Sequence, residues 1–332
     1  MIPHLPRVLV VTMGGTIASV PAADGRDAVP RLGPAELLAS VPGAEHVAAV
    51  RTESFRQYPS GDLSIADVVE LAQLVHKRSG EVDGVVVTQG TDTLEETSFL
   101  LDLLLDAEAP PVVLTGAMRN PGLAGPDGPA NLLAALRVAA APQARGLGPL
   151  VVFADEIHLP RFVRKLHSSS VHAFGSPNTG PVGWVTEDRV RIPLVPRHRE
   201  PLCAPASLPA RLPSVGIVRI GLGADPLRPE HVTGLDGLVV EVFGGGHVPS
   251  AIVDSLVQIT TRIPVVMATR TGAGELYEST YAFPGSERDL LDRGILSAGA
   301  LDGTKARLLL ILLIAAEART EVIRERFTAA TA

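Results

Sequence analysis

The sequence predicts an α/β protein with a larger N-terminal domain, whose mainly parallel sheet is flanked by helices, and a smaller C-terminal α/β domain. Three observations lead to this prediction. Short runs of β-branched residues alternate with amphipathic stretches, which is typical of parallel strands covered on both faces. The chain has 332 residues, enough for roughly two domains. Prolines crowd into residues 193–213, where they would break a helix or a central strand.

The first domain is expected to cover residues 1–192. Its strands are predicted at four apolar runs rich in valine, residues 8–11, 85–87, 112–114 and 151–153. Helices are predicted between these runs, because a proline or a capping residue opens each periodic apolar stretch. They begin at Pro34, Ser64, Thr93 and about Ala130. After Ser64 and Thr93, an acidic residue three positions later gives the spacing of a capping box.

Residues 193–213 are interpreted as a linker between the domains. The second domain is then expected to cover residues 214–332. In it the alternation resumes, with apolar runs at 215–220, 237–242, 249–258 and 264–268, and a final helix at about 304–318. This pattern predicts a second, smaller α/β unit.

Composition excludes several classes of protein. The formal charge is −7 with both signs interspersed, whereas a nucleic-acid surface needs a basic patch. A single cysteine, Cys203, rules out an internal disulfide and a zinc site built from several cysteines. The N-terminal apolar run is shorter than a signal-peptide core, and the longest run, residues 308–316, is too short for a membrane span. We therefore expect a cytoplasmic protein without nucleic-acid or membrane partners, although cleaved secretion stays open.

Candidate chemistry lies just after two strands, because ligands bind beyond the carboxyl ends of strands in open α/β sheets. One strand leads into Gly14, Gly15 and Thr16, where glycines permit a tight turn and close approach of a ligand. Another leads into Thr91 and Asp92, just before a predicted helix whose N-terminus favours developing negative charge. A hydroxyl beside a carboxylate suits a proton relay or a substrate ammonium. Ordinary explanations remain open: Thr16 in a strand–turn connection, and Asp92 as a helix cap.

Other positions carry weaker signals. Residues 116–119 and 127–131 have the composition of loop architecture. Lys165 would ordinarily be a solvated surface lysine, but a lysine paired with Thr91 or Asp92 could serve as a base. The chain lacks the dinucleotide-binding glycine fingerprint, the P-loop, the G-x-S-x-G elbow and the H-E-x-x-H zinc motif. We therefore expect no cofactor and no catalytic metal.

Together these segments resemble the bacterial-type L-asparaginase (asparaginase/glutaminase) family over roughly residues 7–327. The matching segments are residues 13–18 (MGGTIA), 87–97 (VTQGTDTLEET), 116–119, 127–131, 165, 244–249 (GGGHVP) and 305–307. The resemblance implies a two-domain enzyme that hydrolyses the side-chain amide of L-asparagine to L-aspartate and ammonia. Glutaminase side activity stays open, since one methylene is worth only ~1–3 kcal/mol of discrimination.

The resemblance also implies roles for individual residues. Thr16 would be the nucleophile, with Thr91, Asp92 and Lys165 completing the catalytic set. The implied substrate-binding residues are Gly15, Ser60, Gly61, Gly90, Thr91, Asp92, Ala117, His247 and Glu287. In this set Ser60 would meet the substrate carboxylate, and Asp92 its α-ammonium. Glu287 matches a position that in the family reaches a neighbouring subunit's site, which implies a homodimer or a homotetramer with sites near subunit interfaces.

The chain departs from the family pattern in the loop after Thr16. Many members place a tyrosine there, but residues 19–30 contain none. The whole chain has three tyrosines, Tyr58, Tyr277 and Tyr281. We hypothesise that Tyr281, and after it Tyr58, fills that role, with a loop residue or water as the alternatives.

Two other functions compete with the hydrolase. A non-catalytic amino-acid sensor on the same fold would be expected to have lost a hydroxyl or the lysine, and Thr16, Thr91 and Lys165 are all present. A subunit of a tRNA-dependent amidotransferase would carry an additional N-terminal domain, whereas here the first signature begins at Met13. The sequence therefore favours the enzyme, with the sensor as the main alternative.

Overall fold

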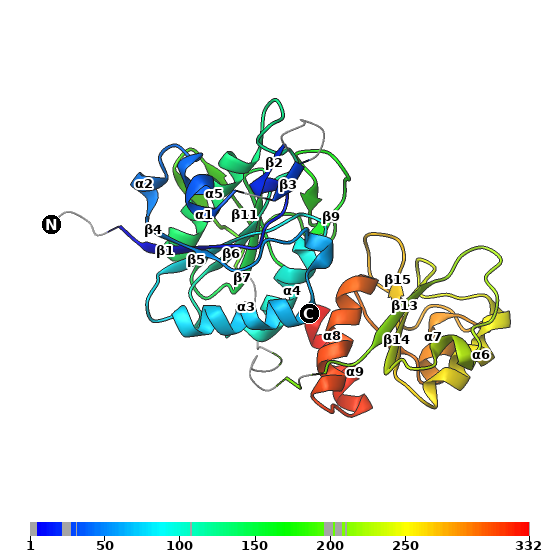
Figure 1. The fold of residues 1–332 in the computed structure, drawn as a ribbon. Helices are drawn as coiled ribbons and strands as arrows, with labels where there is room; N and C mark the ends of the chain where they lie inside the picture. Colours follow the sequence, from blue (N-terminus) through cyan, green and yellow to red (C-terminus); the bar gives the residue numbers. More distant parts are fainter. Residues whose placement is uncertain are drawn as a thin grey trace. The chain divides into compact units, whose positions relative to one another are not determined.

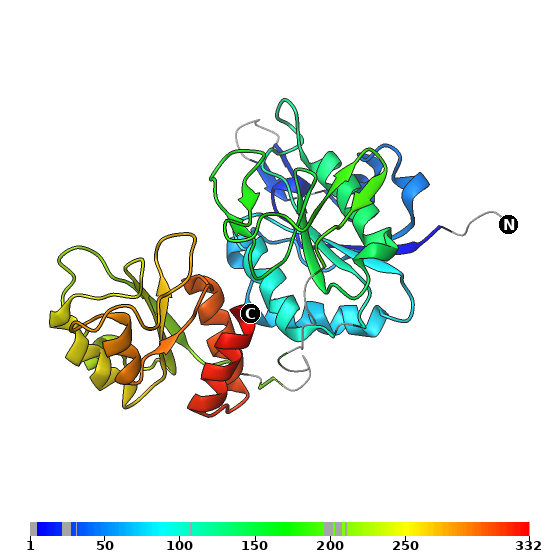
Figure 2. The same ribbon diagram turned by 180° about the vertical axis from the view of Figure 1, so that it is seen from behind.

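A computed structural model describes residues 5–21, 28–30, 32–106, 108–195, 202, 208–209 and 211–331. The chain divides into two compact units, Met1–Ala206 and Ser207–Ala332, which are coloured blue to green and green to red in Figures 1 and 2. Cys203, most of the proline-rich segment and loop residues 22–27 lie outside the described residues. None of the described helices is long and apolar enough to cross a membrane.

The first unit is built on an eight-stranded sheet with the order β12-β11-β8-β7-β6-β5-β1-β4. The strands are β1 (Arg7–Thr12), β4 (Ala49–Ser54), β5 (Gly84–Thr88), β6 (Val112–Thr115), β7 (Pro149–Phe153), β8 (Glu156–His158), β11 (Gly183–Thr186) and β12 (Arg189–Arg191). Strands β4, β1, β5, β6 and β7 run parallel. The mainly parallel sheet predicted from the sequence is thus confirmed.

The other edge of the sheet is antiparallel, which the sequence did not predict. Strands β7, β8, β11 and β12 pair in antiparallel fashion. Side chains on β11 alternate between buried and exposed, so these short strands lack the continuous apolar runs of the central ones. Strand β4 was not predicted either, because its side chains are exposed or only half-buried and form no apolar run.

Helices cover both faces of this sheet. They are α1 (Pro34–Ala39), α2 (Ala44–Val47), α3 (Ile65–Arg78), α4 (Leu94–Leu104) and α5 (Gly128–Ala140). Helices α3 and α4 pack against each other on one face, and α5 packs with α2 on the other (Figure 1). Two small hairpins complete the unit: β2 (Ser19–Pro21) with β3 (Ala28–Pro30), and β9 (Arg164–Lys165) with β10 (Phe174–Gly175).

One of the two predicted capping boxes forms and the other does not. At α3, Ser64 Oγ accepts the Asp67 N–H at 3.1 Å and Asp67 Oδ2 accepts the Ser64 N–H at 2.9 Å. At α4, the Thr93 side chain caps nothing. Its hydroxyl instead donates to Ser60 O at 2.9 Å and accepts from Gln89 Nε2 at 3.0 Å. The prediction of a capping box at Thr93 is therefore wrong, because Gln89 and the distant Ser60 occupy its hydroxyl.

The second unit has a four-stranded parallel sheet in the order β13-β14-β15-β16. Its strands are β13 (Val215–Arg219), β14 (Gly237–Val242), β15 (Val265–Thr269) and β16 (Leu296–Ser297), and its α-helices are α6 (Ser250–Thr260), α7 (Glu287–Asp292), α8 (Gly303–Ala315) and α9 (Thr320–Thr331). Helix α8 packs on β13, β14 and β15 and on α9. Since it is covered on two sides, α8 can be apolar around most of its surface. It ends before the predicted boundary, and α9 follows it.

Candidate active site

The carboxyl end of β1 forms a tight glycine turn against the end of β5. The Met13 N–H donates to Thr88 O at 2.9 Å, and Gly15 follows with a φ of +85°. A Cβ atom on Gly15 would lie 2.2 Å from the backbone nitrogen of Gly90. Only glycine permits this backbone contact. Because Gly15 touches Gly90, the residues that follow them, Thr16 and Thr91, lie on adjoining loops.

Lys165 holds Thr91 and Asp92 in one hydrogen-bonded set. Its Nζ donates to Thr91 Oγ1 at 2.9 Å and to Asp92 Oδ1 at 2.6 Å. The Lys165 side chain is only 17 % exposed, whereas that of Asp92 is 75 % exposed. The Lys165 N–H also donates to Glu95 Oε2 at 2.5 Å, so the first turn of α4 fixes the lysine backbone. Lys165 is therefore not a solvated surface lysine, and the Asp92 carboxylate is paired with Lys165, while the N-cap position of α4 is Thr93.

Ser60 lies directly beside this set. It is buried in a single 3₁₀ turn, residues Ser60–Asp62, and its Oγ accepts the Asp92 N–H at 3.3 Å. A Cβ atom on Gly90 would lie 2.6 Å from Ser60 Oγ, so the two chain segments touch. Gly61 follows with open space where a side chain would be. The structure thus brings Ser60, Gly90, Thr91 and Asp92 together.

The loop that carries Ala117 is held by α5. Asn131 Nδ2 donates to Gly116 O at 3.0 Å, and Asp127 accepts the N–H groups of Met118 and Arg119 at 3.0 and 2.8 Å. Asp127 and Asn131 are therefore framework residues, in agreement with the loop architecture expected from the sequence.

The start of α5 connects Ala117 to the nucleophile loop. Ala117 itself is buried. A Cβ atom on Gly128 would lie 2.9 Å from Ile17 Cγ1 and 3.4 Å from Ala117 Cβ. Since Ile17 follows Thr16, the Ala117 loop and the Thr16 turn both pack against the first residue of α5.

His247 and Glu287 belong to the second unit, where Glu287 is fully buried at 0 % exposure. Its Oε1 accepts the N–H groups of Thr280 and Tyr281 at 2.7 and 2.6 Å, and its Oε2 lies 3.1 Å from His247 Nε2. Burial raises the pKa of Glu287, but these hydrogen bonds outweigh it and leave the pKa below its ordinary value. Within this unit Glu287 anchors the turn that carries Tyr281, and its role in a neighbour's site stays a prediction.

Sequence reasoning missed two supporting residues. The predicted capping box at Thr93 uses Glu96 and gives no role to Glu95, whose carboxylate binds the Lys165 backbone. Gln89 links the strand end to Thr93, and its only signal in the sequence is its place within the matching segment 87–97. Among the described residues, no three His, Cys, Asp or Glu side chains cluster in a way that could hold a metal ion.

Comparisons with known proteins give matches to one family over nearly the whole chain. Residues 7–196 match the family model "Asparaginase, N-terminal", and residues 214–327 match "Glutaminase/Asparaginase C-terminal domain". A probable L-asparaginase from Deinococcus radiodurans is 41 % identical over 329 residues, which cover 98 % of each chain. An L-asparaginase from Bacillus licheniformis is 34 % identical, covering 97 % of this chain and 98 % of its own length.

A solved structure gives the same result for the fold. The crystal structure of a probable cytoplasmic L-asparaginase from Campylobacter jejuni has a TM-score of 0.85 to this chain and is 28 % identical in sequence. The match covers 97 % of this chain and 99 % of that one. The similarity thus extends over both units.

Proposed function

This chain belongs to the glutaminase/asparaginase family, and we propose that it is an L-asparaginase that hydrolyses the side-chain amide of L-asparagine with Thr16 as nucleophile. One observation carries the proposal. Lys165 Nζ bonds both Thr91 Oγ1 and Asp92 Oδ1, on the loop that Gly15 touches. A hydroxyl, a lysine and a carboxylate are therefore assembled beside a second hydroxyl.

The threonine hydroxyl needs help because a neutral alcohol is a poor nucleophile. In the proposed reaction the Thr16 oxygen bonds to the amide carbon, and its proton passes to Thr91 directly or through one water. Lys165 exchanges that proton with Thr91, and Asp92 stabilises the charge on Lys165. The amide nitrogen takes up a proton and leaves as ammonia, so an acyl-threonine remains. Water then hydrolyses this ester, which releases L-aspartate and restores the Thr16 hydroxyl.

The tetrahedral intermediate carries an oxyanion that needs donors placed in advance. We assign this task to backbone N–H groups of the glycine turn at Gly15 and of the loop at Thr91. The N-terminus of α4 follows Thr91 and favours negative charge there. Deleting one such donor typically costs about 3–4 kcal/mol of transition-state stabilisation.

The two ends of the amino acid would bind at separate groups. Asp92 is exposed although its Oδ1 bonds Lys165, so it can meet the substrate's α-ammonium. Ser60, Gly61 and Gly90 would bind the α-carboxylate through hydroxyl and backbone donors. The main chain of Ala117 would contact the amide.

A second assignment, with Thr91 as the nucleophile, is favoured by one observation. Lys165 bonds the hydroxyl of Thr91, whereas no described residue forms a hydrogen bond with the Thr16 hydroxyl. We prefer Thr16 because no described residue engages its hydroxyl, while that of Thr91 is engaged as the relay. The two assignments differ in which threonine becomes acylated.

Ammonia release from L-asparagine and L-glutamine tests the activity. The wild type should release ammonia, the Thr16→Ala variant should lose the activity, and the Thr52→Ala variant should keep it, because Thr52 is exposed on β4. A wild type that releases no ammonia from either amide would favour the amino-acid sensor instead. The ratio of the two wild-type rates ranks asparagine against glutamine.

We further propose a cytoplasmic homodimer or homotetramer, in which Glu287 serves a neighbouring subunit's site. We also propose two domains, residues 1–192 and 214–332, joined by a linker at residues 193–213. The family models support these boundaries, since the N-terminal model ends at residue 196 and the C-terminal model begins at residue 214. Sedimentation velocity of the purified protein would distinguish a monomer from either assembly.

A further inference from the structure

A cavity of about 630 Å³ lies in the first unit, away from the residues described above. Helix α2, the end of α5 and strand β12 line it, together with Pro6. Pro6 precedes β1, whereas Thr16 follows it, and β1 is about 20 Å long at ~3.3 Å per residue. The cavity therefore lies near the amino ends of the parallel strands, whereas Thr16 and Thr91 follow their carboxyl ends. Its volume falls within the range of small-molecule sites.

Positive charge dominates the lining of this cavity. The lining contains three arginines, Arg137, Arg189 and Arg191, the histidine His46, and a single acid, Asp188. Arg189 bonds Glu187 at 2.9 Å, and His46 lies 3.6 Å from Glu45. The formal charge of the whole chain is −7, so this is a local concentration of cations in an acidic protein.

Arg137 is the most informative member of this set. It lies in the last turn of α5, where helix carbonyls favour a cation. Its Nε is buried and has no hydrogen-bond partner in the part of the chain that the structure describes. The Nε of Arg78 is unpartnered as well, but Arg78 bonds Glu53 and Glu81 through its other nitrogens. The other guanidinium nitrogens of Arg137, in contrast, form no ion pair or hydrogen bond with a described residue.

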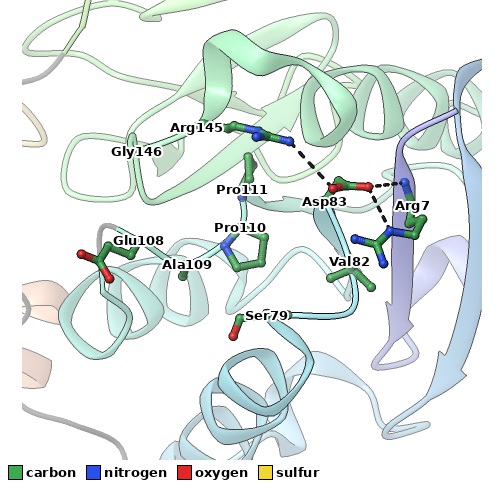
Figure 3. A pocket seen from close by; sticks show the side chains of 11 residues that line it. Arg7, Ser79, Val82, Asp83, Glu108, Ala109, Pro110, Pro111, Arg145 and Gly146 are labelled. Atoms are coloured by element: carbon green, nitrogen blue, oxygen red, sulfur yellow. Dashed lines mark hydrogen bonds and ion pairs between the residues drawn. The ribbon is translucent and has the colours of Figure 1, made fainter. Parts of the chain in front are cut away.

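A second cavity of about 390 Å³ also lies near the amino ends of the parallel strands, and its arginines are paired with an acid. There Arg7 and Arg145 both point toward Asp83 (Figure 3). Arg7 Nε lies 3.2 Å and an Arg145 nitrogen 3.8 Å from the Asp83 carboxylate. Hydrogen bonds from the Arg7 backbone N–H and then its side chain lower the pKa of Asp83 below its ordinary value. These arginines already have their counter-ion, whereas Arg137 has none among the described residues.

We propose that the cavity between α2, α5 and β12 binds a small oxyanion with two negative charges, either a phosphate or a dicarboxylate. A partly buried guanidinium without a partner is costly, and an anion removes this cost. The planar fork of arginine matches carboxylate and phosphate oxygens in pairs. Arg137 and Arg191, which form no ion pair with a described residue, match a dianion. Arg189 and His46 would line its entrance.

Calorimetric titration of the full chain with inorganic phosphate tests this site. The wild type should bind about one phosphate per chain. The Arg137→Gln variant should bind at least tenfold more weakly, as expected when a charge-assisted hydrogen bond is lost. The Arg191→Gln variant should also bind phosphate more weakly. Because Arg191 is exposed, this substitution should leave the protein folded. The Arg145→Gln variant is the matched control, since it removes the same charge from the cavity of Figure 3.

A second arm with succinate separates the two sources of the oxyanion. Displacement of phosphate by succinate identifies a dicarboxylate site, and binding of phosphate alone identifies a phosphate site. The proposal is overturned if the wild type shows no saturable binding of either anion. It is also overturned if Arg145→Gln weakens binding as much as Arg137→Gln, because the effect would then follow from overall charge.

Discussion

Replacing Gly15 with alanine tests whether the two catalytic loops are held by backbone contact. Gly15 has a φ of +85° and a ψ of −174°, a backbone conformation nearly confined to glycine that costs an L-residue about 1–3 kcal/mol. The new Cβ atom would also lie 2.2 Å from Gly90 N and 2.3 Å from Gly90 Cα. Both atoms belong to the backbone, so one loop must shift, and such overpacking typically costs about 1–3 kcal/mol. The variant should therefore lose roughly 2–6 kcal/mol of folding stability.

Gly43 provides a control for a positive φ without a backbone clash, and its ψ of 1° places it in the left-handed region. Its φ is +82°, but a Cβ atom there would meet nothing within 4 Å. Gly43→Ala should therefore lose only the backbone contribution of about 1–2 kcal/mol. Urea unfolding followed by circular dichroism measures both variants, and ammonia release measures their activity. Gly43→Ala should keep wild-type kcat.

Gly15→Ala should also lose activity, by about a hundredfold, because a shift of about 1 Å in catalytic geometry has an effect of this size. Two results would refute the reasoning. Equal stability losses at Gly15 and Gly43 would mean that the contact with Gly90 does not restrain the fold. Wild-type kcat/KM in Gly15→Ala would mean that the position of Thr16 does not depend on this contact.

Further predictions concern three other side chains. Lys165→Met should lower kcat about 10²–10⁴-fold without unfolding the protein, whereas Lys77→Met, on the exposed face of α3, should change little in the same ammonia assay. Burial, together with the charge of His172, lowers the pKa of His158 from 6.5 to about 4. Between pH 6.5 and about 4 the unfolded chain thus binds a proton at His158 that the folded chain does not. The free energy of unfolding, measured in urea, should therefore fall by up to about 3 kcal/mol as the pH drops through this range. The His158→Gln variant should show a weaker dependence of stability on pH. Tyr281→Phe should lower kcat if its hydroxyl replaces the missing loop tyrosine, and an unchanged rate would rule this out.

Thr16 and Thr91 could be brought together from sequence because both follow predicted parallel strands. The carboxyl ends of such strands share one edge of the sheet, and the glycines before each threonine indicate close backbone approach. Lys165 could not be placed in the same way. It reaches Thr91 from a two-residue strand that leaves no periodic pattern in the sequence, and Glu95 anchors it from a distant segment.

The other differences also come from long-range contacts. The Thr93 hydroxyl failed to cap α4 because Ser60 O competes for it, and nothing near Thr93 in the sequence signals that contact. The antiparallel edge at β8, β11 and β12 has short strands, and those with polar, exposed side chains resemble loops. Glu287 could be identified by family resemblance, but its burial by Thr280, Tyr281 and His247 follows only from the packing of the second unit.

The most direct test of the central claim is to identify the acylated threonine. The wild type would be quenched with acid during turnover of L-asparagine, digested and analysed by mass spectrometry. We predict an aspartyl adduct on the peptide that contains Thr16, absent from the Thr16→Ala variant. An adduct on the peptide that contains Thr91 would contradict the account.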